Sequence, residues 1–405
     1  MSGIEGHSFR IGDRVASLRP LAGMTQDEFA QAAHISVSVV RAVEQGQTPA
    51  SASFTAAAAT ALSVDVTVLT GQPYDELVCD PRSDAAAIPA LREVLDEDDD
   101  PAMITEPTST DELRGRLDAG ARLRFHSQYA ELCRELPELL RHLYAHQAAP
   151  PRDERARELL ATLLDDAYSL AHTVTYRFGF LDLTARLDDR RDRAAAATAD
   201  PLRVAAAAFV RTDLPLTWGD YEACRRRIDG ALHLIADLPG ATARAVRGQL
   251  HLRQAIVAAR DARGADADAH VGEARDIIAS GVPAHPYLDI NCSSVNADIH
   301  HVAVPVELAD GATAVARAES VQVGDDDRER YRIGHHHIDL ARAWVLHGDR
   351  AKALDALTTA RAITPQLARY HPAVRETVHA IAEAERRDPE SLPNFVRWVD
   401  FTAQA

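Results

Sequence analysis

The chain has 405 residues, of which 46% are hydrophobic and 26% charged, and its formal net charge is −17. This length and composition are typical of a globular protein of two or three domains and exclude a largely disordered chain. No apolar run approaches the length of a membrane span, and the first ten residues lack the basic and apolar regions of a signal peptide. We therefore expect a cytoplasmic protein that does not span a membrane.

The first predicted elements are two short helices joined by a tight turn. Thr25 and Glu28 have the spacing of a capping box, in which each side chain accepts a hydrogen bond from the other residue's backbone N–H. Ser36 can cap the second helix. His34, in the turn between them, is among the residue types that tolerate a positive φ, and Gly46 ends the pattern. This arrangement predicts a helix-turn-helix.

This stretch, with residues 11–15 before it and 62–66 after it, resembles the DNA-binding domain of lambda-type repressors, the XRE family. The resemblance covers residues 9–74 and implies a five-helix domain. By position, Gln26 would bind a phosphate, and residues near the start of the second helix would face the bases. The residues that the resemblance assigns to double-stranded DNA are Gln26, Ser36, Val37, Ser38 and Arg41. Arg41 is the only long donor that would face the bases, and arginine to guanine is the commonest specific contact.

The charge of this region leaves a second interpretation open. Residues 1–74 contain four arginines and six carboxylates, so the region is net acidic. DNA binding draws much of its affinity from phosphate neutralisation, and a basic surface is expected. A vestigial domain that has lost DNA binding is therefore the alternative, although helix N-termini and backbone amides also hold phosphates.

A boundary is expected after this domain. Residues 79–110 contain four prolines and the carboxylate run 96–100, which favours a solvated linker, with a short helix at 88–95. We therefore expect three regions: a helix-turn-helix domain at 1–78, an acidic linker at 79–110, and a helical domain at 111–405.

From residue 111 onward, helix-length segments alternate with short turns about forty residues apart. Turns are expected at 179–180, 219–220, 264–266, 310–311 and 348–349, and the last unit runs from 328 to 365. Small residues after each turn would let paired helices approach closely. The units resemble tetratricopeptide repeats. The predicted fold is therefore all-α: a lambda-repressor-like domain followed by an α-solenoid of about five helix pairs, with a capping helix at 393–401.

A repressor-type domain joined to such a solenoid is similar in architecture to the peptide-pheromone receptors of Gram-positive bacteria. Segments 69–74 and 336–343 also resemble a group of actinomycete regulators. The resemblance implies a homodimeric transcriptional regulator that binds an operator and senses a peptide or small molecule on the concave face of the solenoid. A solenoid deforms easily when each repeat contacts only its neighbours, so a ligand can shift its curvature.

Four polar residues are candidates to bind that ligand. Asn296 and His300 are one helical turn apart in one unit, and Arg332 and His336 are one turn apart in the next. They can grip a ligand on the inner face, or they can be buried hydrogen-bond bridges between repeats. Both interpretations stay open on the sequence.

Other chemistries receive little support. Successive residues of a helix point in different directions, so at most one or two of the histidines at 300–301 and 335–337 could bind the same ion. A closed metal site needs about four ligands, and we therefore expect none here. The four cysteines are far apart, which favours reduced structural thiols. No phosphate-binding loop, nucleophile elbow or zinc-protease motif is present, so we expect neither a cofactor nor an enzyme. A protein-binding or peptide-binding scaffold, or less readily an enzyme recruited from this architecture, remains the alternative.

Overall fold

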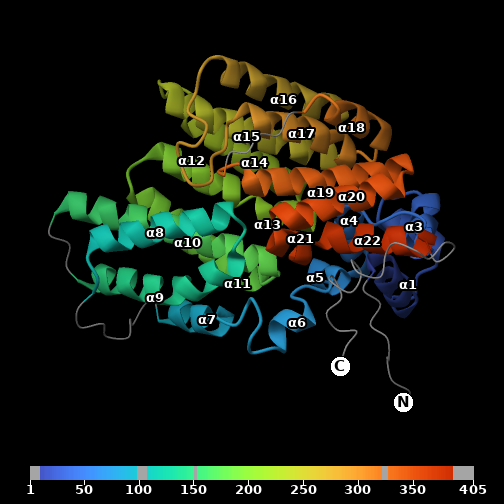
Figure 1. The fold of residues 1–405 in the computed structure, drawn as a ribbon, viewed down its shortest axis with the longest axis horizontal. Coiled ribbons are helices and arrows are strands. Elements are labelled where there is room, and N and C mark those ends of the chain that lie inside the picture. Colours follow the sequence, from blue (N-terminus) through green and yellow to red (C-terminus); the bar gives the residue numbers. More distant parts are fainter. Residues whose placement is uncertain (1–9, 98–106, 150–152, 322–326, 386–405) are drawn as a thin grey trace.

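The computed structural model describes residues 10–97, 107–149, 153–321 and 327–385, and every regular element in these ranges is a helix (Figure 1). The predicted all-α fold is confirmed. Among the described residues, no helix is both long enough and apolar enough to cross a lipid bilayer. Five helices form the N-terminal domain, here called the head: α1 (Ile11–Leu21), α2 (Gln26–Ala32), α3 (Val37–Glu44), α4 (Ala52–Leu62) and α5 (Val66–Thr70).

The local signals that predicted the first helices are present in the head. The Thr25 hydroxyl accepts from the Glu28 amide at 3.2 Å, and the Glu28 carboxylate accepts from the Thr25 amide at 2.8 Å. The Ser36 hydroxyl caps α3, and His34 has φ 55° in the turn. These caps satisfy backbone donors that a helix N-terminus otherwise leaves without partners.

A compact apolar core holds the five helices of the head together. Phe29 of α2 and Val40 of α3 are fully buried in it. Gly12 lies where α1 crosses α3, and a Cβ at this position would lie 2.2 Å from the carbonyl oxygen of Val43. Only glycine therefore allows the two helices to approach this closely.

The region expected to be a linker, 79–110, contains a packed helix at the place where a short helix was expected. α6 (Asp75–Val78) is followed by α7 (Ile88–Asp96), which packs against α9 and buries Leu91, Val94 and Leu95 completely. The last three residues of the acidic run, 98–100, lie outside the described residues. Burial of α7 makes it part of the main apolar core of the helical region.

The rest of the described chain forms helical hairpins, as the spacing of turns predicted. In the described ranges, the helices form six paired units (α8 with α9, α10 with α11, α12 with α14, α15 with α16, α17 with α18, α19 with α20), one more than expected, and neighbouring units also pack against each other. Turns at Gly179, Gly219 and Gly348 have positive φ, whereas Gly264 begins a helix. The expected capping helix at 393–401 lies outside the described residues. The helices are α8 (Thr110–Phe125), α9 (Tyr129–Ala148), α10 (Glu154–Phe178), α11 (Leu181–Ala197), α12 (Pro201–Val210), α13 (Asp213–Trp218), α14 (Tyr221–Leu234), α15 (Ala241–Arg260), α16 (Gly264–Ala279), α17 (Ser294–Glu307), α18 (Gly311–Ala318), α19 (Arg330–His347), α20 (Arg350–Ile363), α21 (Pro365–Tyr370) and α22 (Pro372–Glu385).

The two ends of the solenoid meet, which the sequence did not predict. The Gln366 side chain of α21 accepts from the backbone N–H of Ala130 in α9 at 2.9 Å, and the rings of Phe178 and Tyr370 pack edge to face. The main apolar core combines side chains of α7 to α11 with side chains of α19 to α22. The expectation that each repeat contacts only its neighbours is therefore wrong, because the superhelix curves until its last unit rests on its first.

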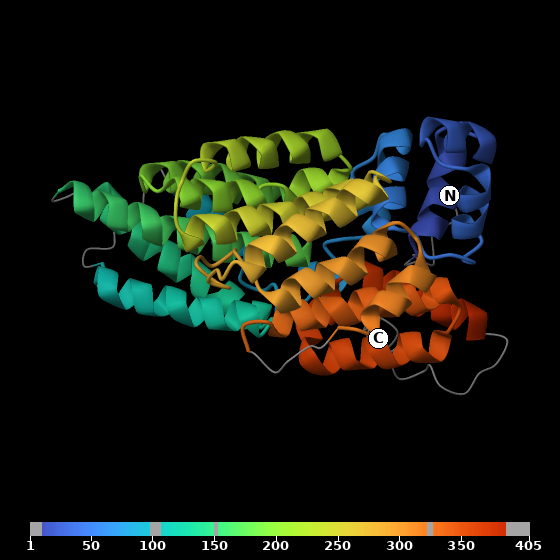
Figure 2. The same cartoon turned by 90° about the horizontal axis from the view of Figure 1, so that it is seen from above.

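The head docks on this closed superhelix through α1, α4 and α5, beside α13 and α22 (Figures 1 and 2). Glu376 of α22 accepts from the backbone N–H of Ile11 at 2.7 Å, and it also accepts from the backbone N–H of Ala50. Gln72 donates to the carbonyl oxygen of Tyr370 at 3.2 Å. The C-terminal helix thus caps the first helix of the head.

Candidate nucleic-acid interface and ligand cavity

The exposed face of α3 carries most of the side chains that the sequence assigned to DNA. Ser36, Ser38 and Arg41 are exposed, and Val37 is half-buried. Val39, exposed by 41%, adds an apolar group to the same surface. The docked side of the head is formed by α1, α4 and α5, so the face of α3 remains accessible to a large partner.

Gln26 belongs to a polar network that holds Arg41 in place. Its side-chain amide donates to Glu44 at 2.6 Å and accepts from Arg41 at 3.3 Å. Glu44 also accepts from Arg19 at 2.7 Å. Because an amide NH₂ has two donors, Gln26 can keep this bond to Glu44 and still donate to a phosphate.

Arg41 is weakly neutralised at its exposed position. Its guanidinium lies 3.5 Å from the carboxylate of Asp27, and the two side chains are 56% and 73% exposed. Surface ion pairs of this kind contribute little, because solvent screens both partners. Arg41 can therefore exchange Asp27 for a base edge at small cost.

A second feature is a cavity inside the superhelix, here called the central cavity, of about 220 Å³. It is lined by α10, α13, α15, α17 and α19 and by parts of α8, α9 and α12, whereas α11, α14, α16, α18 and α20 contribute none of its lining. A cavity of about 150 Å³ accommodates benzene, so this one can hold a small organic molecule. The inner helices of the repeats therefore enclose a space of ligand size.

Three of the four predicted ligand residues meet in this cavity. Asn296, His300 and Arg332 line it, whereas His336 is buried outside it and His335 lines it instead. The Arg332 guanidinium donates to the side-chain oxygen of Asn296 at 2.7 Å. These contacts connect α17 with α19, so the residues form a bridge between repeats as well as a cavity wall.

The cavity has a strongly charged lining. Asp213 accepts from His172 at 3.2 Å and lies 2.7 Å from Arg253. Burial alone would lower the pKa of His172, but the carboxylates of Asp188, at 2.6 Å, and Asp213 outweigh it and raise the pKa to about 9. Among the described residues, the ionic side chains of the lining, besides histidine, are Arg124, Arg177, Arg253, Arg260, Arg332, Arg342, Asp213, Asp289, Glu307 and Asp339.

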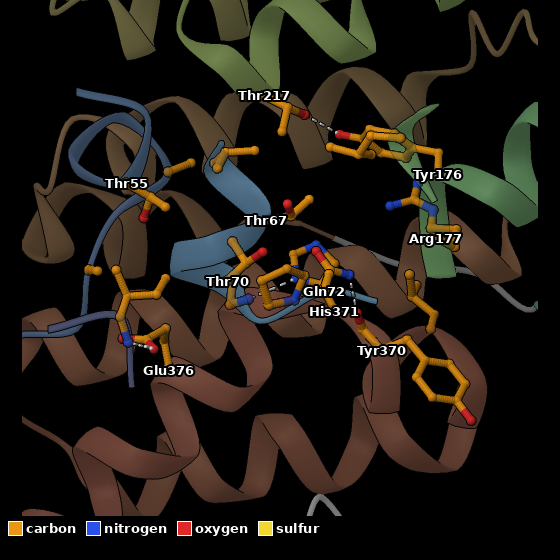
Figure 3. A pocket seen from close by; sticks show the side chains of 18 of the residues that line it. Thr55, Thr67, Thr70, Gln72, Tyr176, Arg177, Thr217, Tyr370, His371 and Glu376 are labelled. Carbon is orange, nitrogen blue, oxygen red and sulfur yellow. Dashed lines mark hydrogen bonds between the residues drawn. The ribbon is translucent and has the colours of Figure 1, made fainter. Parts of the chain in front are cut away.

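A second cavity, here called the interface cavity, lies between the head and the superhelix and measures about 170 Å³ (Figure 3). Thr55, Thr67 and Thr70 line it from the head. Arg177 and His371 point into it from the superhelix, as Figure 3 shows. The head therefore closes one side of this space.

The two cavities share a wall of six residues: Tyr176, Arg177, Arg260, Glu307, Arg342 and His371. Glu307 of α17 is buried and accepts from Arg260 of α15 at 3.0 Å and from Arg342 of α19 at 2.8 Å. Three successive repeats are thus joined at the wall. A molecule in the central cavity would touch side chains that also face the head.

Sequence reasoning missed this shared wall. Arg177, Arg260 and Arg342 lie on inner helices of three different units, α10, α15 and α19, with another unit between each pair, so no regular spacing in the sequence linked them. Burial, with Arg177 as the largest charged neighbour, lowers the pKa of His371 to about 3, so its ring is neutral. Among the described residues, no group of three or more histidine, cysteine or acidic side chains is arranged to hold a metal ion.

Comparison with known families gives one match. Residues 10–70 match the family model described as a helix-turn-helix domain, which spans α1 to α5. A search of curated proteins and a search of solved structures gave no match. The chain therefore carries an N-terminal helix-turn-helix domain, followed by an all-α solenoid.

Proposed function

We propose that this protein is a sequence-specific DNA-binding transcriptional regulator of the lambda-repressor type. The observation that carries the proposal is the face of α3, which stays exposed while the opposite side of its helix-turn-helix domain is docked. Arg41 is the specificity residue: its guanidinium would bind a guanine, and Ser38 lies beside it. Gln26 would hold the neighbouring phosphate.

We further propose that the protein acts as a homodimer and senses a ligand. A single head contacts one half-site, and two heads about 34 Å apart would contact successive major grooves. The tetratricopeptide-like domain would bind a peptide or small molecule in the central cavity. The shared wall supports this role, because a ligand that moved Arg177 or Glu307 would also change the surface on which the head rests.

The proposed domain boundaries separate the DNA-binding role from the ligand-sensing role. The head would be residues 1–78, the connecting segment 79–110, and the sensing and dimerising domain 111–405. The packed α7 supports a firm connection between head and superhelix, because it fixes the end of the segment that leaves the head.

The first experiment tests DNA binding. The purified protein is titrated into a duplex from upstream of its own gene and into a scrambled duplex, with fluorescence anisotropy read at two salt concentrations. Arg41→Ala should cost about 1 to 3 kcal/mol of discrimination between the duplexes. Arg226→Ala, an exposed arginine of α14, is the matched control and should bind like the parent.

The alternative function is a protein-binding or peptide-binding scaffold with a vestigial head. The observation in its favour is the acidic head, in which Arg41 lies beside Asp27 rather than among other basic groups. If the parent protein binds neither duplex at low salt, with or without candidate ligands, the scaffold replaces the regulator. Equal affinity of Arg41→Ala and parent for the upstream duplex would remove Arg41 from the proposal.

A further inference from the structure

The central cavity is more positive than the chain that surrounds it. Six arginines and four carboxylates line it among the described residues, while the whole chain has a net charge of −17. All four carboxylates are ion-paired: Asp213 with Arg253, Asp289 with Arg124, and Glu307 and Asp339 with Arg342. Arg260 shares Glu307.

Two arginines of the cavity remain without a carboxylate partner among the described residues: Arg177 of α10 and Arg332 of α19. Arg177 forms no ion pair with a described residue; its guanidinium lies 5.6 Å from the centre of the Tyr176 ring, and the carboxylate of Asp213 attracts it only from a longer distance. Arg332 has the neutral oxygen of Asn296 and the ring of Tyr331, at 5.7 Å. Both are largely withdrawn from solvent, and the carboxylates that attract them, Asp213 for Arg177 and Asp339 for Arg332, form their ion pairs with other arginines.

The contact between Arg332 and His300 does not compensate that charge. The Nδ1 atom of His300 lies 2.7 Å from the carbonyl oxygen of Asn296, which can only accept, so Nδ1 carries the proton. It therefore cannot accept from Arg332, which approaches it at 3.4 Å. The guanidinium of Arg332, which lines the cavity, therefore keeps N–H donors that neither Asn296 nor His300 uses.

The two arginines act on a common space. Burial lowers the pKa of His335 well below its ordinary value, and the next causes include the positive charges of Arg177 and Arg332. All three side chains line the same cavity, so both guanidinium groups are close enough to His335 to act on its ring. Phe209 and Ile256 of the lining provide apolar surface in the same cavity.

We propose that the central cavity binds a small organic oxyanion, a carboxylate or phosphate carried on an apolar body, with Arg177 and Arg332 as its ligands. A guanidinium presents donors in a planar fork that matches either group. This inference rests on the proposed sensing function and names the chemical class of the effector. Because Arg177 also faces the interface cavity, the anion would bind at the wall that the head closes.

The test is thermal unfolding in sodium phosphate, sodium benzoate and sodium chloride at equal ionic strength. The parent should show a midpoint that rises and saturates with phosphate or benzoate relative to chloride, since a ligand that binds only the folded state stabilises it. The double variant Arg177→Gln/Arg332→Gln should lose this response, and Arg226→Gln, the surface control, should keep it. Response to phosphate alone or to benzoate alone identifies the preferred oxyanion, and either supports the proposal.

A second measurement separates a binding role from a structural one. In chloride alone, the double variant should unfold within a few degrees of the parent, because neither arginine has an ion-paired carboxylate that the substitution would leave buried without a partner. Arg260→Gln, in the same wall but paired with Glu307, should unfold several degrees lower.

The proposal is overturned if the parent responds to neither oxyanion, or if the double variant keeps the response. It is also overturned if the double variant unfolds as early as Arg260→Gln in chloride. These unfolding measurements do not involve DNA. If the protein failed to bind its operator, the proposed regulator function would be refuted and the proposed anion site would not.

Discussion

Docking of the head should weaken as the pH rises, through the side chain of Glu376. Burial raises the pKa of this carboxyl to about 7 from an ordinary value of 4.5, although the backbone amides of Ile11 and Ala50 and the charge of Arg10 oppose the rise, while Asp13 adds to it. The docked state therefore keeps a proton that an undocked, exposed Glu376 has already released. The docking free energy that this retained proton contributes is fully present below pH 4.5 and is lost as the pH rises through 7.

The magnitude follows from the two pKa values. Each tenfold change in proton affinity is worth about 1.4 kcal/mol, so the difference amounts to about 3 kcal/mol of docking free energy between pH 4.5 and pH 7. Glu376→Gln keeps an acceptor oxygen for the backbone amide of Ile11 and cannot ionise. This variant should dock about as well as the parent at pH 5 and more tightly, by up to about 3 kcal/mol, at pH 8.

Hydrogen–deuterium exchange across pH 5 to 8, corrected for intrinsic exchange rates, measures this effect. Peptides that contain the amides of Ile11 and Ala50 should lose protection with rising pH in the parent but not in Glu376→Gln. Glu222→Gln, at an exposed site on α14, is the control and should follow the parent. Parallel pH profiles for parent and Glu376→Gln would refute the reasoning.

Three further outcomes are expected. Gly12→Ala should destabilise the head by at least about 1 to 3 kcal/mol in chemical denaturation, because its Cβ forces α1 away from α3; Gly115→Ala, with open space around it in α8, should be neutral or stabilising. Asp188→Asn should cost about 3 to 5 kcal/mol and reduce the stability that the parent loses as the pH rises through about 9, because buried His172 loses the nearer of its two carboxylate partners and keeps only Asp213. Asp189→Asn, largely exposed, should change stability by less than about 1 kcal/mol. Gln26→Ala should lower affinity for specific and scrambled duplexes by the same factor, about 3- to 10-fold in anisotropy, and a change in their ratio would assign it to base recognition.

The head was predictable because its signals are local. The capping box at Thr25 and Glu28, the cap at Ser36 and the turn at His34 each involve residues within one helical turn of each other. The glycine turns of the repeats are local in the same sense. Sequence reasoning therefore located helices α2, α3, α19 and α20 to within about two residues.

The cavity was less predictable because it depends on how far the superhelix curves. Arg332 shares a helical face with residues three and four positions later, and the sequence favoured His336, whereas the structure turns His335 inward. The residues around Arg177 in α10 do not indicate that its side chain lines a cavity. Arg177 lies in the shared wall because α21, far away in the sequence, packs against α10. The packed helix α7 was readable from the spacing of its apolar residues, but the prolines and carboxylates around it favoured a solvated segment.

The cap that Glu376 places on α1 has a consequence for the synthesis of the protein. The two residues it joins, Ile11 and Glu376, are 365 positions apart, so at the usual speed of translation the cap arrives roughly 20 to 70 s after the first helix has left the ribosome. The apolar core of the head needs no later residue except Leu181 at its edge. Every newly made chain therefore passes through an interval in which the face of α3 that we propose to bind DNA exists and α22, which caps α1, does not.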